Sequence, residues 1–151
     1  ARLWHPRGPG FGPRKEMFAM IVTPLYAGLL ALWFMVLSIW VIMGRSGPDG
    51  VSLGDGGKAE MTRRIRGHAN FAEYVPMVLV LLGVSELSAA PGWLLHAVGL
   101  SLLVGRLLHG YALSFTAHFM PGRLLGMILT FSALLLAGGY CAGYGVAKLI
   151  Q

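Results

Sequence analysis

The feature that most limits the fold is a long stretch without charge near the start of the chain. Phe18–Met43 contains no charged residue, and a helix needs about 20 mainly apolar residues to cross a bilayer. The apolar core of a signal peptide spans only about 7–15 residues. We therefore interpret Phe18–Met43 as a retained transmembrane helix, with Pro24 tolerated near its start.

Three further segments have the length and apolar character of membrane-spanning helices. They run from Ala59 to Ser88, from Trp93 to Phe115 and from Leu124 to Ala147. Charged residues make up only 12% of the chain, against about 25% in a typical soluble domain. We predict an all-α membrane protein, a bundle of four transmembrane helices.

The chain divides into a short tail and one membrane domain. Residues 1–16 are basic and rich in glycine and proline, so we expect an extended or loosely ordered tail. Residues 17–151 form the four-helix domain. Its predicted connections are the loop Gly44–Lys58, the turn Ala89–Gly92 and the loop Thr116–Gly122.

Basic residues lie at the ends of the predicted helices. The net charge of +6 raises the question of nucleic acid, but a helical membrane bundle offers no basic docking face, so we expect none. Arginine and lysine favour cytoplasmic loops. We therefore place the first and third loops on the cytoplasmic side of the membrane, although the basic tail opposes this orientation. These loops and the helix starts beside them carry Arg45, Lys58, Arg63, Arg64, Arg66 and Arg123.

A polar stripe enters the second predicted helix. At about 100° per residue, Arg63, Arg66, Asn70 and Glu73 fall within about 80° of one another. Ionisable groups inside a membrane are costly and usually serve a function. Cations, an amide and a carboxylate on one face predict a site for a charged, zwitterionic ligand.

The third predicted helix carries polar residues at a matching depth. Asn70 and Glu73 lie about 16–21 Å into the second helix, and Arg106 lies about 14 Å from the end of the third. Both depths fall in one half of the bilayer, which predicts that Arg106 and Glu73 can meet as a pair. His109 shares the face of Arg106, and Arg123 lies at the mouth of the same side.

Three motifs carry a family resemblance. They are R-R-I-R-G-H-A-N-F-A-E-Y-V-P at Arg63–Pro76, G-R-L-L-H at Gly105–His109 and P-G-R-L-L-G at Pro121–Gly126. Over Met17–Ile150 the chain resembles the membrane-associated proteins in eicosanoid and glutathione metabolism, the MAPEG family, most closely its bacterial branch. The resemblance implies a bacterial inner-membrane protein, a homotrimer of four-helix bundles that binds glutathione between subunits near the cytoplasmic face.

The resemblance to microsomal glutathione transferases also implies residue roles. An arginine fork suits the two carboxylates of glutathione, and Glu73 suits its ammonium. A cation beside the thiol lowers its pKa from about 8.5 and so favours the thiolate, which is the role implied for Arg123. The implied glutathione contacts are Arg66, His68, Asn70, Glu73 and Arg106, with Arg63 and His109 as additional candidates.

The sequence differs from the better-studied family members in a way that leaves two functions possible. Leu113 stands where the better-studied members carry a tyrosine, and the spacing to Arg123 differs by about one residue. The first hypothesis is a glutathione transferase or peroxidase that attacks a lipophilic electrophile or lipid hydroperoxide. The second is a non-enzymatic accessory or scaffold subunit of a larger membrane assembly.

Structural interpretations stand beside the functional ones. Arg63 and Arg64 are candidates for interfacial anchors. A purely structural cluster inside the membrane is the alternative for Arg66, Asn70, Glu73 and Arg106. His96 and His109 point about 140° apart on one helix, so we expect no haem. No ligand cluster has a recognised metal-binding spacing, so we expect no metal.

Overall fold

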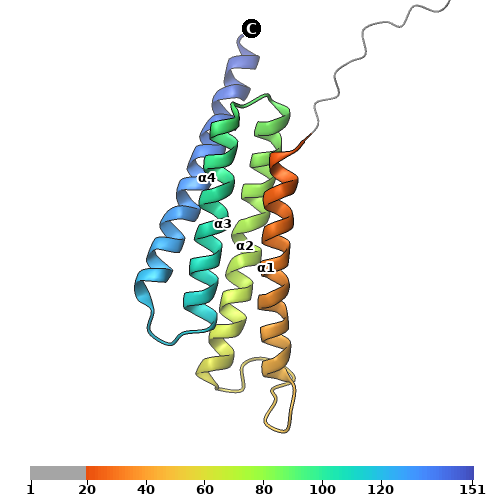
Figure 1. Ribbon diagram of the computed structural model, residues 1–151, viewed down its shortest axis with the longest axis vertical. Helices are drawn as coiled ribbons and strands as arrows, with labels where there is room; N and C mark the ends of the chain where they lie inside the picture. Colours follow the sequence, from red (N-terminus) through yellow and green to blue (C-terminus); the bar gives the residue numbers. More distant parts are fainter. Residues whose placement is uncertain (1–19) are drawn as a thin grey trace, which may run out of the picture.

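Four helices in sequence build the chain as a bundle (Figure 1). The structure, a computed structural model, describes residues 20–151, so the predicted tail at residues 1–16 lies outside the described part. The helices are α1 (Val22–Arg45), α2 (Ala59–Leu87), α3 (Gly92–Ser114) and α4 (Met120–Leu149). All four are long and apolar enough to cross a membrane, which confirms the predicted fold class.

The first helix begins at Val22 and not at Phe18. Pro24 then falls in the first turn, where its missing N–H leaves no hydrogen bond unmade. The carboxylate of Glu86, at the end of α2, accepts hydrogen bonds from the N–H groups of Ile21 and Val22, both at 2.7 Å, and of Thr23 at 2.8 Å. Glu86 therefore caps α1 from a neighbouring helix.

The last helix begins four residues before the predicted Leu124. It starts at Met120, with Pro121 in its first turn, a position that suits proline. The predicted loop Thr116–Gly122 is therefore shorter than expected. Arg123 lies in the first turn of α4 and not before the helix.

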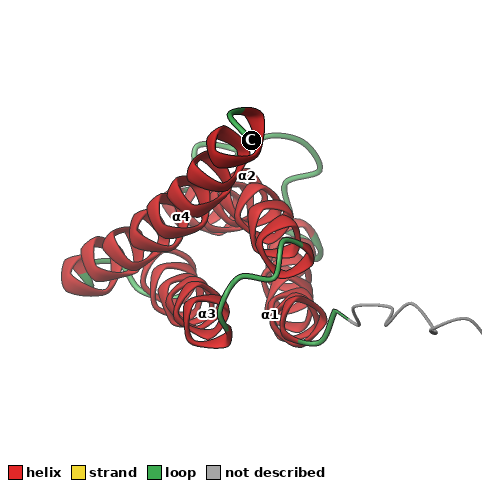
Figure 2. Cartoon of the chain, turned by 90° about the horizontal axis from the view of Figure 1, so that it is seen from above, coloured by secondary structure: helices red, strands yellow, loops and turns green. Residues whose placement is uncertain are grey.

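Close contact between helices determines where the interior lies. α1 packs on α2 and α3 but, within residues 20–151, not on α4, and Figure 2 shows α4 leaning across the far side of the bundle. α3 and α4 approach each other closely at two glycines. A Cβ atom on Gly105 would lie 2.9 Å from the Gly126 carbonyl oxygen, and one on Gly126 would lie 2.7 Å from that of Gly105. Small residues permit such close crossings in membranes.

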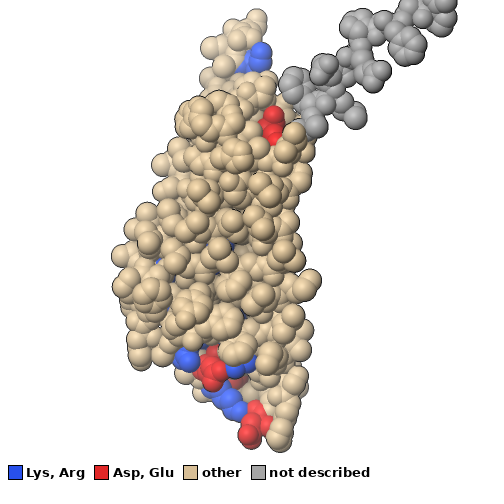
Figure 3. All heavy atoms as spheres, in the orientation of Figure 1, with Lys and Arg blue, Asp and Glu red and all other residues tan. Residues whose placement is uncertain are grey.

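The outer surface follows the membrane pattern. Large apolar side chains are exposed along all four helices, among them Leu32, Val80, Leu100 and Leu135. On the face shown in Figure 3, charged side chains gather mainly at the end that holds the α1–α2 loop. A broad uncharged zone separates that end from the opposite one, as expected for a protein surrounded by lipid.

Candidate polar site inside the bundle

A buried arginine lies at the centre of the polar residues. Arg106 on α3 is only 1% exposed. One terminal nitrogen donates to Asn70 Oδ1 on α2 at 2.8 Å, and the other donates to Thr130 Oγ1 on α4 at 2.5 Å. The guanidinium carbon also lies 5.6 Å from the ring centroid of Tyr74. Arg106 thus links three helices, and its contact with Asn70 confirms that these two residues lie at one depth.

The predicted pair between Arg106 and Glu73 is wrong. Within residues 20–151 the ion pair formed is that of Arg64 with Glu60. The polar stripe is wide enough that its two sides differ in burial. Asn70 lies on the side toward the bundle interior and is partly buried, whereas Glu73 lies on the outer edge and is exposed. Asn70 therefore takes the position beside Arg106 that was expected for Glu73.

The surroundings of Arg106 are polar but neutral. Besides Asn70 and Thr130, the contacts are the Gly126 carbonyl oxygen at 3.5 Å and the Met127 sulfur at 3.4 Å. No carboxylate of residues 20–151 lies within ion-pair distance of it. A buried cation without an anion is costly, so this position is suited to a negatively charged ligand group.

His109 connects Arg106 to the start of α4. It lies one turn after Arg106 and is 8% exposed. Its Nδ1 donates to the Arg123 carbonyl oxygen at 3.2 Å, and its buried Nε2 has no hydrogen-bond partner among the described residues. The Arg123 guanidinium reaches the carbonyl oxygens of Ala112 at 3.5 Å and Ala117 at 3.4 Å. It therefore lies at the junction of α3 and α4.

Other predicted site residues lie apart from Arg106. His68 stacks on Phe34 of α1, with ring centroids 4.6 Å apart, and so turns away from the stripe. Arg66 is exposed on the outer edge with Glu73. Arg63 is partly buried, and its Nε has no hydrogen-bond partner among the described residues.

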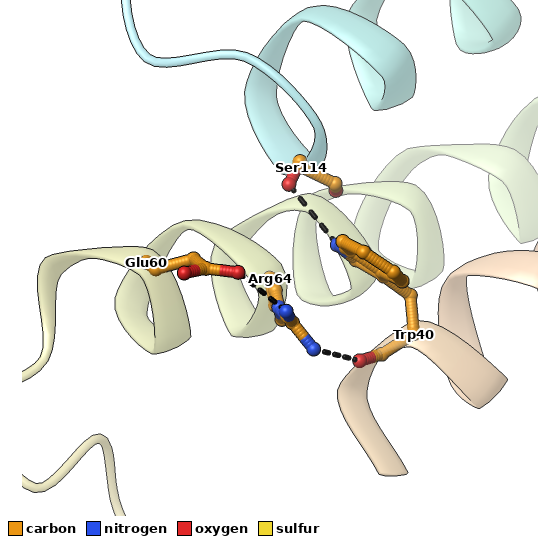
Figure 4. A network of polar contacts seen from close by, with 4 residues as sticks. All are labelled: Trp40, Glu60, Arg64 and Ser114. Atoms are coloured by element: carbon orange, nitrogen blue, oxygen red, sulfur yellow. Dashed lines mark hydrogen bonds and ion pairs between the residues drawn. The ribbon is translucent and has the colours of Figure 1, made fainter. Parts of the chain in front are cut away.

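Arg64 forms a separate network that anchors α1 (Figure 4). Its guanidinium carbon lies 3.9 Å from the Trp40 ring centroid, and the group donates to the Trp40 carbonyl oxygen at 3.0 Å and pairs with Glu60. The Trp40 indole donates to the Ser114 carbonyl oxygen on α3 at 3.2 Å. These contacts support the interpretation of Arg64 as an interfacial anchor.

Sequence reasoning missed two partners of Arg106. Thr130 is fully buried and lies on α4, four residues after Gly126. Its hydroxyl in a largely apolar part of the helix was the available signal. Trp33 on α1 donates its indole N–H to the Arg106 carbonyl oxygen at 3.1 Å, and no motif marked this contact. Within residues 20–151, His, Cys, Asp and Glu form no group suited to hold a metal ion.

Four membrane-crossing helices around a buried arginine define a polytopic α-helical membrane protein. The chain belongs to the MAPEG family, whose family model matches residues 23–143. Two relatives, each named inner membrane protein YecN, come from Escherichia coli strains K12 and O6:H1 (CFT073). Each is 40% identical over 116 residues, which cover 77% of this chain and 86% of the relative. No solved structure matches the chain significantly. The comparisons confirm the predicted family and a multi-pass protein of the bacterial inner membrane.

Proposed function

We propose that the protein binds glutathione and presents its thiolate to a lipophilic second substrate. The observation that carries the proposal is Arg106, a buried cation whose contacts in the described chain are neutral. A carboxylate of glutathione would supply the missing anion, because charge-assisted hydrogen bonds to guanidinium are strong. Membership of a family that includes glutathione transferases supports the same ligand.

The chemistry requires a thiolate at neutral pH. A free thiol has a pKa of about 8.5, and a nearby cation lowers it; we assign this role to Arg123. The thiolate sulfur then bonds to an electrophilic carbon and displaces its leaving group. With a lipid hydroperoxide, the sulfur instead takes the terminal peroxide oxygen and releases the alcohol. A second glutathione converts the resulting sulfenic acid to the disulfide and water.

The exposure of Glu73 supports a site shared between subunits. Glu73 lies at the midpoint of α2 and is exposed on the single chain. A carboxylate facing hydrocarbon at that depth is costly, so a neighbouring copy covering this face would stabilise it. We propose the homotrimer that the family resemblance implies, with Glu73 and Arg66 at the contact between subunits.

The first test is glutathione binding by isothermal titration calorimetry on the purified protein in detergent. Arg106→Gln and Glu73→Gln should each weaken binding by about tenfold or more, because each removes a charge-assisted contact of about 1.5–3 kcal/mol. Lys148→Ala is the control, since it removes an exposed cation at the far end of α4. Unchanged affinity in both site variants, in a folded oligomer, would exclude this site.

Thiolate formation is tested separately by ultraviolet absorbance. Glutathione added at neutral pH should give a thiolate signal with the wild-type protein and a much smaller one with Arg123→Ala. An equal signal in both would rule out Arg123 as the activating cation.

The second candidate function is an accessory subunit without catalysis. Leu113 favours it, because this partly buried side chain supplies no hydroxyl where the better-studied members carry a tyrosine. Purification in a mild detergent distinguishes the two functions. A stable heteromeric complex that binds no glutathione would favour the accessory role.

A further inference from the structure

The first turn of α4 receives little support from its own residues. Phe119, which precedes the helix, has no polar side chain with which to cap it. Pro121 carries no N–H group, and the N–H of Arg123 lies 3.4 Å from the Phe119 carbonyl oxygen, a long hydrogen bond. A helix start without a side-chain cap is weakly fixed. The position of Arg123 therefore depends on contacts with another helix.

His109 on α3 supplies such a contact. Its Nδ1 lies 3.2 Å from the Arg123 carbonyl oxygen. A carbonyl oxygen only accepts, so the proton is on Nδ1, and the second lone pair of the oxygen remains for the hydrogen bonds of α4 itself. The imidazole is buried, and its helix lies close to α4, because a Cβ atom on Gly126 would lie 2.7 Å from His109 Cβ. Both ends of this contact are thus held in place.

The guanidinium of Arg123 is held less firmly than its backbone. Its Nε lies 3.5 Å from the Ala112 carbonyl oxygen, and a terminal nitrogen lies 3.4 Å from that of Ala117. Normal N–H···O hydrogen bonds measure about 2.7–3.2 Å. The guanidinium can therefore turn toward a ligand, whereas the place from which it turns is set by the backbone.

We propose that His109 is a positioning residue that holds Arg123 beside the glutathione thiol. The inference rests on the proposed function and deepens it, because it assigns the residue that sets the place of the activating cation. This role uses Nδ1. A direct contact with glutathione, the role considered for His109 from the sequence, would use Nε2, which has no hydrogen-bond partner among the described residues. The two roles can therefore be separated by experiment.

Stabilisation of the thiolate depends on how near the cation lies. The attraction between opposite charges falls with their separation. Without the contact to His109, the first turn of α4 can shift along α3, and the guanidinium of Arg123 moves with it. The pKa of the bound thiol then returns toward the value of about 8.5 of a free thiol, while the proposed carboxylate contact at Arg106 remains.

The test uses two amides that each reproduce one ring nitrogen. The side chain of His109→Asn places an amide nitrogen near the position of Nδ1, and the longer one of His109→Gln places it near Nε2. Thiolate absorbance of bound glutathione is followed against pH in detergent. His109→Asn should keep the wild-type pH midpoint, and His109→Gln should raise it by about one pH unit, with little change in glutathione affinity. His96→Gln is the matched control, since it makes the same change at the far end of α3.

A measurement on the wild-type protein does not depend on the folding of the variants. Nitrogen NMR of histidine-labelled protein in micelles reports which ring nitrogen carries a proton. The proposed contact requires a proton on Nδ1 of His109. A bare Nδ1 with the proton on Nε2 would overturn the inference.

Three other results would overturn it in distinct ways. Equal pH midpoints in His109→Asn and His109→Gln would show that Nδ1 does not position Arg123. A loss of affinity in His109→Asn but not in His109→Gln, with unchanged midpoints, would make His109 a ligand contact through Nε2. If the wild-type protein bound no glutathione, or bound it without a thiolate signal, the proposed function would fail and this role with it.

Discussion

Replacing Thr130 with valine removes the hydroxyl that holds Arg106 against α4 while keeping the size and branching of the side chain. Thr130 is fully buried and accepts from Arg106 at 2.5 Å. In the variant, the same guanidinium nitrogen retains only the Gly126 carbonyl oxygen at 3.5 Å and the Met127 sulfur at 3.4 Å. Both are longer and weaker contacts than the one removed.

Two ranges of hydrogen-bond strength bracket the expected loss of stability. Hydrogen bonds to charged groups contribute about 1.5–3 kcal/mol in proteins, whereas hydrogen bonds between membrane helices average about 0.6 kcal/mol and reach about 1.7. Because the donor here is a buried cation with no anion beside it in the described chain, we expect the upper membrane value. The free energy of unfolding should therefore fall by about 1.5 kcal/mol, roughly tenfold in the equilibrium constant.

Unfolding in mixed micelles with increasing dodecyl sulfate measures this difference. Thr130→Ser should lose less than Thr130→Val, because it keeps the hydroxyl. Ser132→Ala is the matched control on α4, since Ser132 is exposed. If Thr130→Val were within about 0.5 kcal/mol of Ser132→Ala, the hydroxyl would not support Arg106 as argued, because surface substitutions fall in that range.

Three further predictions concern other parts of the chain. Glu86→Gln should lower the free energy of unfolding by about 1 kcal/mol, because the amide has a single oxygen to accept from the N–H groups that begin α1; equal midpoints in the same micelle titration would contradict this capping role. Gly126→Leu should separate α3 from α4 and lower the thermal midpoint by several degrees, whereas the same change at the unobstructed Gly139 should cost little. The Thr62 hydroxyl donates to Asp55 Oδ2 at 2.7 Å and depresses the pKa of this carboxylate of the α1–α2 loop. The depressed pKa should stabilise the loop above about pH 4, with that contribution lost as pH falls through the lower folded-state pKa. An NMR titration of the Asp55 carboxyl should show the pKa rising toward its usual value in Thr62→Val, and an unchanged pKa would argue against the hydrogen bond as the cause.

Helix geometry explains why the depth of Arg106 was predictable. The rise per residue is nearly constant, so counting along two antiparallel helices places Asn70 and Arg106 together, as their 2.8 Å hydrogen bond confirms. The rotation of α2 was not predictable in the same way. A stripe about 80° wide leaves open which edge meets the neighbouring helices, so the pairing with Glu73 was predicted wrongly.

Two other errors have local causes. Pro121 was placed in the predicted loop Thr116–Gly122, but proline also suits a first turn, and α4 begins just before it. Thr130 was overlooked because a threonine in an apolar helix usually bonds its own backbone. It does donate to the Gly126 carbonyl oxygen at 2.8 Å, yet its oxygen also accepts from Arg106. That second bond depends on how α3 and α4 pack and so is absent from the local sequence.

The Glu86 cap has a consequence for the order of biogenesis. Glu86 and the first amide that it binds are 65 residues apart in the chain. At about 5–20 residues per second of synthesis, α1 emerges roughly 3–13 s before the carboxylate that completes its N-terminus. Water or lipid headgroups must satisfy those amides in the interval. The N-terminus of α1 is therefore capped only after Glu86 has reached the side of the membrane opposite the basic loops. Completion of the α1–α2 hairpin thus depends on the translocation of this one acidic residue.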